Sequence, residues 1–195
     1  SSDLKDLKPA GVFKYFEEIC QVPRPSKKEE KIIAYLKAFG AKHNLETNVD
    51  EAGNVLIKKP ATPGKENLQT VILQSHIDMV CEKNNDVQHD FLTDPIETEI
   101  DGEWLKAKGT TLGADNGIGV ATELAILADD SIEHGPLECL FTVDEETGLT
   151  GAFELKEGFM SGDILLNLDS EDEGEIFIGC AGGIDSVAEF SYKEV

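Results

Sequence analysis

Three short apolar runs in this chain each lead directly into a cluster of acidic or imidazole side chains. The runs are Val71–Leu73, Leu140–Val143 and Ile164–Leu166, and each is typical of a strand that is buried on both faces. Strand and helical patterns interleave along the chain, which predicts an α/β domain with a mixed, largely parallel sheet flanked by helices. Because ligands bind beyond the carboxyl ends of the strands in such sheets, we expect the three clusters to meet in space.

The remaining elements follow from periodicity and from turn residues. Apolar side chains recur at helical spacing over residues 9–20 and again in a segment that ends near Gly40. Ser26 is typical of the N-cap of this second helix, and Glu29 would complete a capping box. The polar segment Glu82–Pro95 predicts a long loop, and long loops in compact domains are usually functional. A third helix is expected over residues 117–128, and strands over 54–58, 70–75, 137–143, 164–168, 175–179 and 187–192.

The charge of the chain excludes several classes of function. There are 17 Lys and Arg residues against 39 Asp and Glu residues, so the formal net charge is -22. Such a surface repels phosphate backbones and anionic lipids, so neither a nucleic acid nor a membrane is an expected partner. No apolar run is long enough to span a bilayer, and the polar first residues lack the apolar core of a signal peptide.

The four cysteines favour a reducing, cytoplasmic setting. They are widely scattered and contain no CxxC pair, which argues against a thiolate zinc site and against a disulfide framework. Cys139 and Cys180 lie in apolar runs and are expected to be buried as small hydrophobic residues.

The first polar cluster contains His76 and Asp78. Residues two apart in an extended segment face the same side, so these two side chains should point together. A metal-bound imidazole commonly has a carboxylate partner that fixes its tautomer. A structural hydrogen-bonded pair at a strand end has the same pattern, however. Asp115 follows a glycine-rich segment and precedes a helix, where an ordinary N-cap aspartate is also common.

The other two clusters are acidic. Adjacent carboxylates at Asp144, Glu145 and Glu146 repel one another unless a cation is close. Adjacent residues point in different directions, so one glutamate could bind a metal while its neighbour faces a bound water. Asp169 ends the third strand. Each cluster alone is also typical of a solvated turn, but together one histidine and several carboxylates match a catalytic zinc or manganese site.

Four motifs in the chain resemble those of the di-zinc peptidase family that includes carnosinases, peptidase T and carboxypeptidase G. In the order of the family, they are Ser75–Asp78, Gly113–Gly117, Asp144–Gly148 and Leu168–Glu171. Longer stretches are more similar to the Xaa-His dipeptidases within this family than to its other members. These stretches are Met79–Asn84, Trp104–Gly113 and Ile178–Gly183. The resemblance covers essentially the whole chain.

The resemblance implies a zinc-exopeptidase-like catalytic domain with two Zn²⁺ ions, for which Co²⁺ or Mn²⁺ are possible substitutes. It also implies hydrolysis of dipeptides, including carnosine-like Xaa-His dipeptides, by a water that both ions activate. By position in the motifs, His76 and Asp169 would bind one zinc, Glu146 the other, and Asp115 would bridge them.

Two further roles come from the resemblance. Asp78 would be the carboxylate that orients the first histidine ligand. Glu145 would be the general base that activates the water, and later the acid that protonates the leaving amine.

Complete members of the family are much longer than this chain. Residues 1–183 are therefore expected to be the N-terminal part of an incomplete catalytic domain, and residues 184–195 the start of an inserted lid. The part that follows the lid supplies one more histidine ligand in the family, so the 195-residue chain alone is expected to be inactive or nearly so. The lid would also allow the parent enzyme to pair as a homodimer.

Two other functions fit parts of the pattern. One is a non-catalytic acidic domain that binds divalent ions, although a calcium module needs oxygen ligands and no imidazole such as His76. The other is an N-acyl amino-acid deacylase of the same family. Rates measured side by side on dipeptides and on acyl amino acids would separate the deacylase from the dipeptidase.

Overall fold

The computed structural model describes residues 3–170, 172–179, 182–183 and 186–192 of the chain. Its centre is a five-stranded mixed sheet with the strand order β1-β2-β6-β3-β7. β6, β3 and β7 run parallel, whereas β1 and β2 join them as antiparallel neighbours. The strands are β1 (Glu46–Val49), β2 (Val55–Lys59), β3 (Val71–His76), β6 (Leu137–Thr142) and β7 (Ile164–Asn167). The predicted mixed α/β sheet is confirmed.

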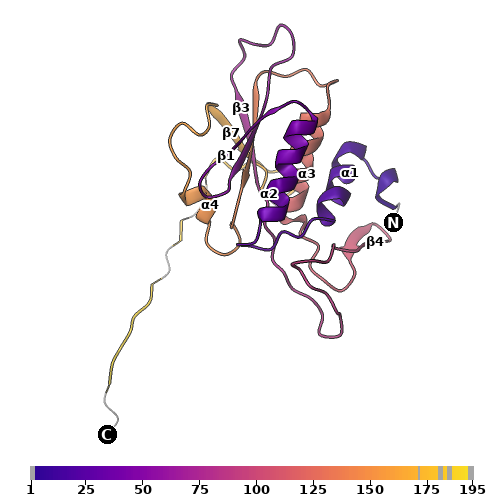
Figure 1. The fold of residues 1–195 in the computed structure, drawn as a ribbon, viewed down its shortest axis with the longest axis vertical. Helices are drawn as coiled ribbons and strands as arrows, with labels where there is room; N and C mark the ends of the chain where they lie inside the picture. The colour runs from indigo at the N-terminus through magenta and orange to yellow at the C-terminus, as the bar shows by residue number, and fades with distance from the viewer. Residues whose placement is uncertain (1–2, 171, 180–181, 184–185, 193–195) are drawn as a thin grey trace.

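Helices cover one face of this sheet, as Figure 1 shows. α3 packs against β3, α1 packs on the outer side of α3, and α2 lies over β1 and β2. The helices are α1 (Ala10–Cys20), α2 (Glu30–Lys42), α3 (Ala114–Ala128) and the short α4 (Thr150–Phe153), with a 3-10 turn, η1, at Asp3–Asp6. None of the helices that the structure describes is long and apolar enough to cross a membrane.

The main core lies between the sheet and its three long helices. Phe16 and Ile19 of α1, Leu36 of α2, Leu124 of α3 and Phe141 of β6 are all buried there. On the opposite face of the sheet, residues of β2, β3 and β6 form a smaller cluster that is covered by residues that follow α4. Its members are Leu56, Ile72 and Leu140, packed against Leu155, Phe159 and Met160. Both faces of the central strands are therefore covered, as their continuous apolar pattern predicts.

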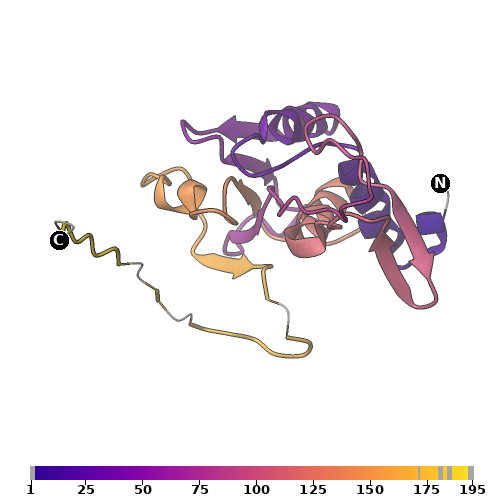
Figure 2. The same ribbon diagram turned by 90° about the horizontal axis from the view of Figure 1, so that it is seen from below.

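A two-stranded hairpin that was not predicted stands apart from the main sheet. It pairs β4 (Thr98–Asp101) with β5 (Trp104–Ala107), and Gly102 takes a positive φ of 63° in the turn. Figures 1 and 2 place it beside the N-terminal helices. The segment before it, Glu82–Pro95, contains no helix and no extended strand, so the predicted long loop is confirmed.

The predicted capping box of the second helix is wrong. α2 begins at Glu30, and the side chains of Ser26 and Glu29 are engaged elsewhere. The Ser26 hydroxyl donates a hydrogen bond to Asp78 Oδ2 at 2.7 Å, and Glu29 Oε1 accepts one from the Asp144 backbone N–H at 3.0 Å. Both residues thus connect the start of α2 to the ends of central strands. The helix also continues to Lys42, past its predicted end near Gly40.

The expected strands at residues 175–179 and 187–192 do not form. Their apolar side chains are largely exposed, with Ile176 at 92% and Val187 at 88%. β7 is also not the buried strand that its apolar run predicted, because Ile164, Leu165 and Leu166 are 39–49% exposed. A strand needs a neighbour to complete its hydrogen bonds and to cover its side chains, and among the described residues β7 pairs only with β3.

The expected boundary between a catalytic domain and a lid at residue 184 falls partly outside the described residues, and so does Cys180. Cys139 is buried as predicted, in the middle of β6. The expected domain division stays a prediction.

Candidate metal centre

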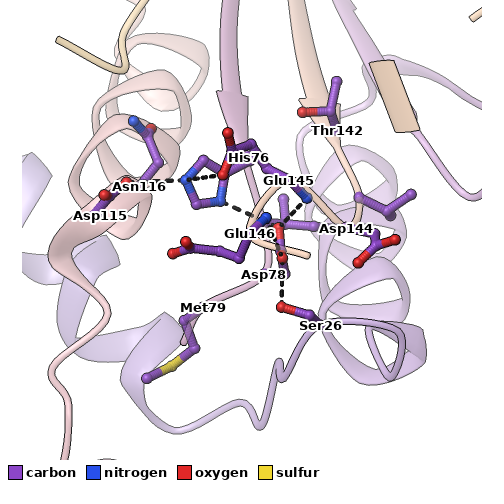
Figure 3. A network of polar contacts seen from close by, with 12 residues as sticks. Ser26, His76, Asp78, Met79, Asp115, Asn116, Thr142, Asp144, Glu145 and Glu146 are labelled. Atoms are coloured by element: carbon purple, nitrogen blue, oxygen red, sulfur yellow. Dashed lines mark hydrogen bonds and ion pairs between the residues drawn. The ribbon is translucent and has the colours of Figure 1, made fainter. Parts of the chain in front are cut away.

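Six predicted side chains come together at one edge of the sheet, at the carboxyl ends of the three parallel strands, and all of them except Asp169 are labelled in Figure 3. The start of α3 lies beside this edge and contributes one of them. They are His76, Asp78, Asp115, Glu145, Glu146 and Asp169. The spatial prediction made from three strand ends is therefore correct.

His76 is the last residue of β3 and lies at the centre of the cluster, only 1% exposed. Its Nδ1 lies 3.2 Å from Asp78 Oδ1, and its Nε2 lies 2.9 Å from Asp115 Oδ1. Burial lowers the pKa of His76, but the hydrogen bonds to these two aspartates and the charge of Asp169 outweigh it and raise the pKa to about 9. In the metal-free chain the imidazole is thus held as a cation among carboxylates at neutral pH.

Asp78 is fully buried and joins β3 to the loop that follows β6. Besides His76 and Ser26, its carboxylate accepts hydrogen bonds from the backbone N–H groups of Glu145 at 3.1 Å and Glu146 at 3.3 Å. Burial raises the pKa of Asp78, but these donors outweigh it and lower the pKa to about 2. Asp78 therefore stays ionised and can fix both the imidazole ring and the acidic loop (Figure 3).

Asp115 lies in the first turn of α3, where the backbone departs from helical geometry. Asp115 and Asn116 have non-helical dihedral angles, and Gly113 precedes them in the left-handed region with a φ of 69°. The Asp115 side chain makes no N-cap hydrogen bond; it turns instead toward His76. The ordinary N-cap alternative for this aspartate is therefore wrong.

The loop after β6 is folded around Asp144, which has a positive φ of 49°. Its carboxylate accepts hydrogen bonds from the hydroxyl groups of Thr147 and Thr150. This turn directs Glu145 to the site, where its Oε2 lies 3.9 Å from His76 Nε2. Burial raises the pKa of Glu145, the His76 cation opposes the rise, and neighbouring carboxylates add to it. Burial is also the main cause of a raised pKa at Glu146.

Asp169 reaches the same place from the end of β7. Its Oδ1 lies 3.8 Å from His76 Nε2 and accepts a hydrogen bond from Asn116 Nδ2. Asn116 also donates to the Leu168 backbone carbonyl at 3.0 Å, so α3 holds the end of β7 in place. Burial raises the pKa of Asp169, and the nearby Asp115 contributes to the rise.

This donor set fits a divalent metal ion. The ligand atoms of His76, Asp115 and Glu146 all lie within 4.8 Å of one another. One imidazole and several carboxylates suit zinc or manganese, and a bound cation would offset both the burial and the mutual repulsion of the glutamate side chains. A second acidic group, Glu29, Asp78 and Asp144, is equally compact, but each of its carboxylates already accepts hydrogen bonds from the protein. That group therefore connects loops of the fold.

Several residues that shape the site were not singled out from the sequence. Arg24 and Asn54 are buried, although each lies in a loop or at a strand end. Asn116 follows a predicted ligand directly, and this position next to Asp115 was the signal that could have identified it. For Arg24 the sequence holds no local signal, because its partners are distant backbone groups. Asn54 has one local partner, Asp50, but its contacts with the loop after β6 are also made to distant backbone groups.

Comparison with known proteins agrees with this geometry. A family model described as peptidase family M20/M25/M40 matches residues 72–189. The cytosol non-specific dipeptidase of Escherichia coli (strain K12) is 53% identical over 184 residues, which cover 94% of this chain and 38% of that protein. The crystal structure of aminoacylhistidine dipeptidase from Vibrio alginolyticus is 56% identical, with a TM-score of 0.86 over 88% of this chain and 35% of that chain.

A more distant solved structure has the same fold. Aminopeptidase PepT from Bacillus cereus is 26% identical, with a TM-score of 0.71 over 83% of this chain and 43% of that chain. The chain thus spans well under half the length of each of these relatives. The family match includes the ends of β3, β6 and β7 and the start of α3, where the acidic cluster lies. From its sequence motifs, fold and family match together, the chain belongs to peptidase family M20/M25/M40.

Proposed function

We propose that this chain holds most of the di-zinc centre of a dipeptidase, and that the longer protein hydrolyses dipeptides, including Xaa-His dipeptides. The observation that carries the proposal is the convergence of His76, Asp115 and Glu146, with Glu145 beside them. The names of the E. coli and Vibrio relatives support a dipeptide substrate. Because the chain spans 38% of the E. coli relative, the activity is proposed for the longer protein.

Four side chains of this chain would hold the ions. His76, Asp115 and Asp169 would bind one zinc, and Asp115 with Glu146 would bind the second, with Co²⁺ or Mn²⁺ as substitutes. The bound ions supply Lewis-acid chemistry, because they polarise the scissile carbonyl and lower the pKa of an attacking water to roughly 7. A further histidine ligand for the second ion would come from the part of the longer protein that follows the lid.

Asp78 would orient the histidine ligand, and Glu145 would move the protons. Asp78, ionised because its pKa is about 2, accepts a hydrogen bond from the Nδ1–H of His76 and leaves Nε2 to face the ion. Glu145 takes a proton from the attacking water and delivers it to the leaving amine. The raised pKa of Glu145 suits this exchange, since a general base works best when its pKa lies near the operating pH.

The proposal also covers the cellular location and the domain organisation of the longer protein. We infer a cytoplasmic location, supported by the name of the E. coli relative and by the three free cysteines among the described residues. Residues 1–183 would form part of the catalytic domain and residues 184–195 would begin a lid, through which two copies could pair.

Zinc binding by the chain tests the proposed centre directly. We expect His76→Ala to weaken zinc binding by more than the roughly 10- to 100-fold that loss of an outer partner of a metal ligand costs. The dissociation constant can be measured by competition with a chromophoric chelator. His134→Ala is a matched control, because His134 contacts the Gly135 carbonyl and lies outside the cluster. Equal zinc affinities of the two variants would contradict the proposed centre, and calcium binding without zinc binding would favour the non-catalytic ion-binding domain.

Zinc affinity should also depend on pH through His76. Zinc binds the neutral imidazole, so it must displace the proton that a pKa of about 9 retains in the metal-free chain. The affinity is expected to rise roughly tenfold per unit between pH 6 and 8, with about one proton released per ion near pH 7. Calorimetry in buffers of different ionisation enthalpy counts these protons, and an affinity that stays constant over this range would contradict the assignment.

The raised pKa of His76 should also make the stability of the metal-free chain depend on pH, in the direction opposite to zinc affinity. Because the folded-state pKa of His76 lies above the unfolded value of 6.5, its contribution to stability is complete below about pH 6.5 and is lost as pH rises through about 9. Urea unfolding of the zinc-free chain at several pH values measures this loss. Stability of the metal-free fold and affinity for zinc should therefore change in opposite directions with pH.

A further inference from the structure

Arg24 lies in the loop between α1 and α2 and is only 3% exposed. Its guanidinium group donates hydrogen bonds to three backbone carbonyls. Nη1 donates to Ile77 at 3.1 Å and to Asp78 at 3.0 Å, and Nη2 donates to Gly113. Burial lowers the pKa of Arg24, and the nearby charge of Asp78 opposes this. A guanidinium remains charged in proteins, so Arg24 is a buried cation whose hydrogen-bond acceptors are turns of the backbone.

These carbonyls belong to the two segments that carry His76 and Asp115. Ile77 and Asp78 directly follow His76 at the end of β3, and Gly113 lies two residues before Asp115 at the start of α3. The hydrogen bond between His76 Nε2 and Asp115 Oδ1, at 2.9 Å, joins the same two segments on the side of the site. Arg24 therefore joins, through their backbone carbonyls, the same two segments whose side chains meet at the site.

The start of α3 has room for the guanidinium only because two glycines lie there. A Cβ added at Gly113 would lie 2.5 Å from Arg24 Nη2, and one added at Gly117 would lie 2.7 Å from the same atom. Both distances are shorter than any ordinary contact. The fit of the guanidinium against this turn of α3 is therefore close on two sides.

We propose that Arg24 is a positioning residue of the metal centre: it holds the turn after β3 against the turn before α3 and so sets the separation of His76 and Asp115. The inference rests on the proposed metal site, since it concerns two of its ligands. Arg24 reaches both segments at once because the guanidinium is a rigid planar fork with donors in several directions. A lysine ammonium is a single point charge on a flexible stem and would not hold both turns in the same geometry.

The charge of Arg24 gives a way to separate geometry from electrostatics. A buried cation near the site repels a divalent ion, so removing only its charge would tighten metal binding. If geometry dominates, the neutral variant Arg24→Gln and the charged variant Arg24→Lys should both weaken it. We expect each to lower the affinity for zinc by about 10- to 100-fold, the range that loss of a supporting contact of a metal ligand typically gives.

The test compares zinc dissociation constants and the visible spectra of the Co²⁺-loaded 195-residue chain. Lys59→Met is a matched control for lost stability, because Lys59 is also a buried cation that donates to backbone carbonyls of the α3 region, those of Ile126 and Asp129. These lie at the opposite end of the helix from Gly113. We expect Lys59→Met to lower the unfolding midpoint while its zinc affinity and Co²⁺ spectrum stay unchanged.

Gly117→Ala provides a second route if the Arg24 variants do not fold. It keeps the guanidinium but displaces Nη2, the flexible end of the side chain, and should weaken zinc binding and change the Co²⁺ spectrum in the same direction. Wild-type affinity and spectrum in Arg24→Lys or in Gly117→Ala, or tighter zinc binding in Arg24→Gln, would overturn the positioning role. Failure of the unaltered chain to bind zinc through His76 would instead overturn the proposed centre itself.

Discussion

Replacing Glu145 with glutamine is expected to lower kcat for dipeptide hydrolysis by about 10²- to 10⁴-fold in the longer protein, while its zinc content stays the same. This is the range that a positioned general acid–base contributes. Glutamine has nearly the same shape as glutamate but cannot accept and return a proton. Glu145 lies 3.9 Å from His76 Nε2 at the edge of the ligand group, so its loss should leave the ligands in place.

Two further glutamates make this experiment specific. Glu146→Gln should reduce zinc content together with activity, because Glu146 belongs to the compact ligand group. Glu154→Gln is the control on the same segment, since Glu154 is the C-cap residue of α4 and lies outside this group. Steady-state rates and metal analysis on the same preparations give both quantities. Full turnover by Glu145→Gln would show that another group moves the proton.

Replacing Asn54 with alanine is expected to lower the free energy of unfolding by about 3–5 kcal/mol, since a buried polar group left without its partner costs about 1–3 kcal/mol. Asn54 is fully buried. Its Nδ2 donates to the Gly151 carbonyl at 2.8 Å, and its Oδ1 accepts from the Val143 N–H at 3.1 Å. Alanine leaves both backbone groups unpaired and opens a cavity beside them.

Asn48→Ala is the matched control for this variant. Asn48 lies on β1, is exposed, and donates only to the side chain of Glu46 among the described hydrogen bonds. Such a surface change is expected to stay within about 0.5 kcal/mol. Urea unfolding followed by circular dichroism measures both variants. Equal stabilities would mean that the loop after β6 does not depend on Asn54.

The sequence predicted the position of the site because two general rules applied there. A continuous apolar run marks a central strand, and parallel strands bring their carboxyl ends to one edge of the sheet. From these rules alone, the sequence predicts that His76, Glu145 and Asp169 lie close together. The same-side geometry of His76 and Asp78 followed from the two-residue period of a strand and is confirmed at 3.2 Å.

The predictions that failed concern side chains and strands whose partners are distant in sequence. Ser26 and Glu29 have the spacing of a capping box, but their side chains hydrogen-bond instead to the Asp78 carboxylate and to the Asp144 backbone N–H. Residues 187–192 alternate as a strand does, yet among the described residues no neighbour pairs with them. Arg24 is flanked by prolines in an apparent surface loop, and only the packed fold shows that it is buried.

The candidate ligands come from segments that are distant in the sequence, so metal binding can be used to follow folding of the protein. Residues from position 76 to position 169 meet only when β3, β6 and β7 are paired and α3 is docked, so an unfolded chain offers no comparable set of ligands. An ion that binds the native state alone stabilises it by mass action, by about 1.4 kcal/mol for each tenfold excess over the dissociation constant. A zinc titration would therefore report the pairing of the three parallel strands and the docking of α3.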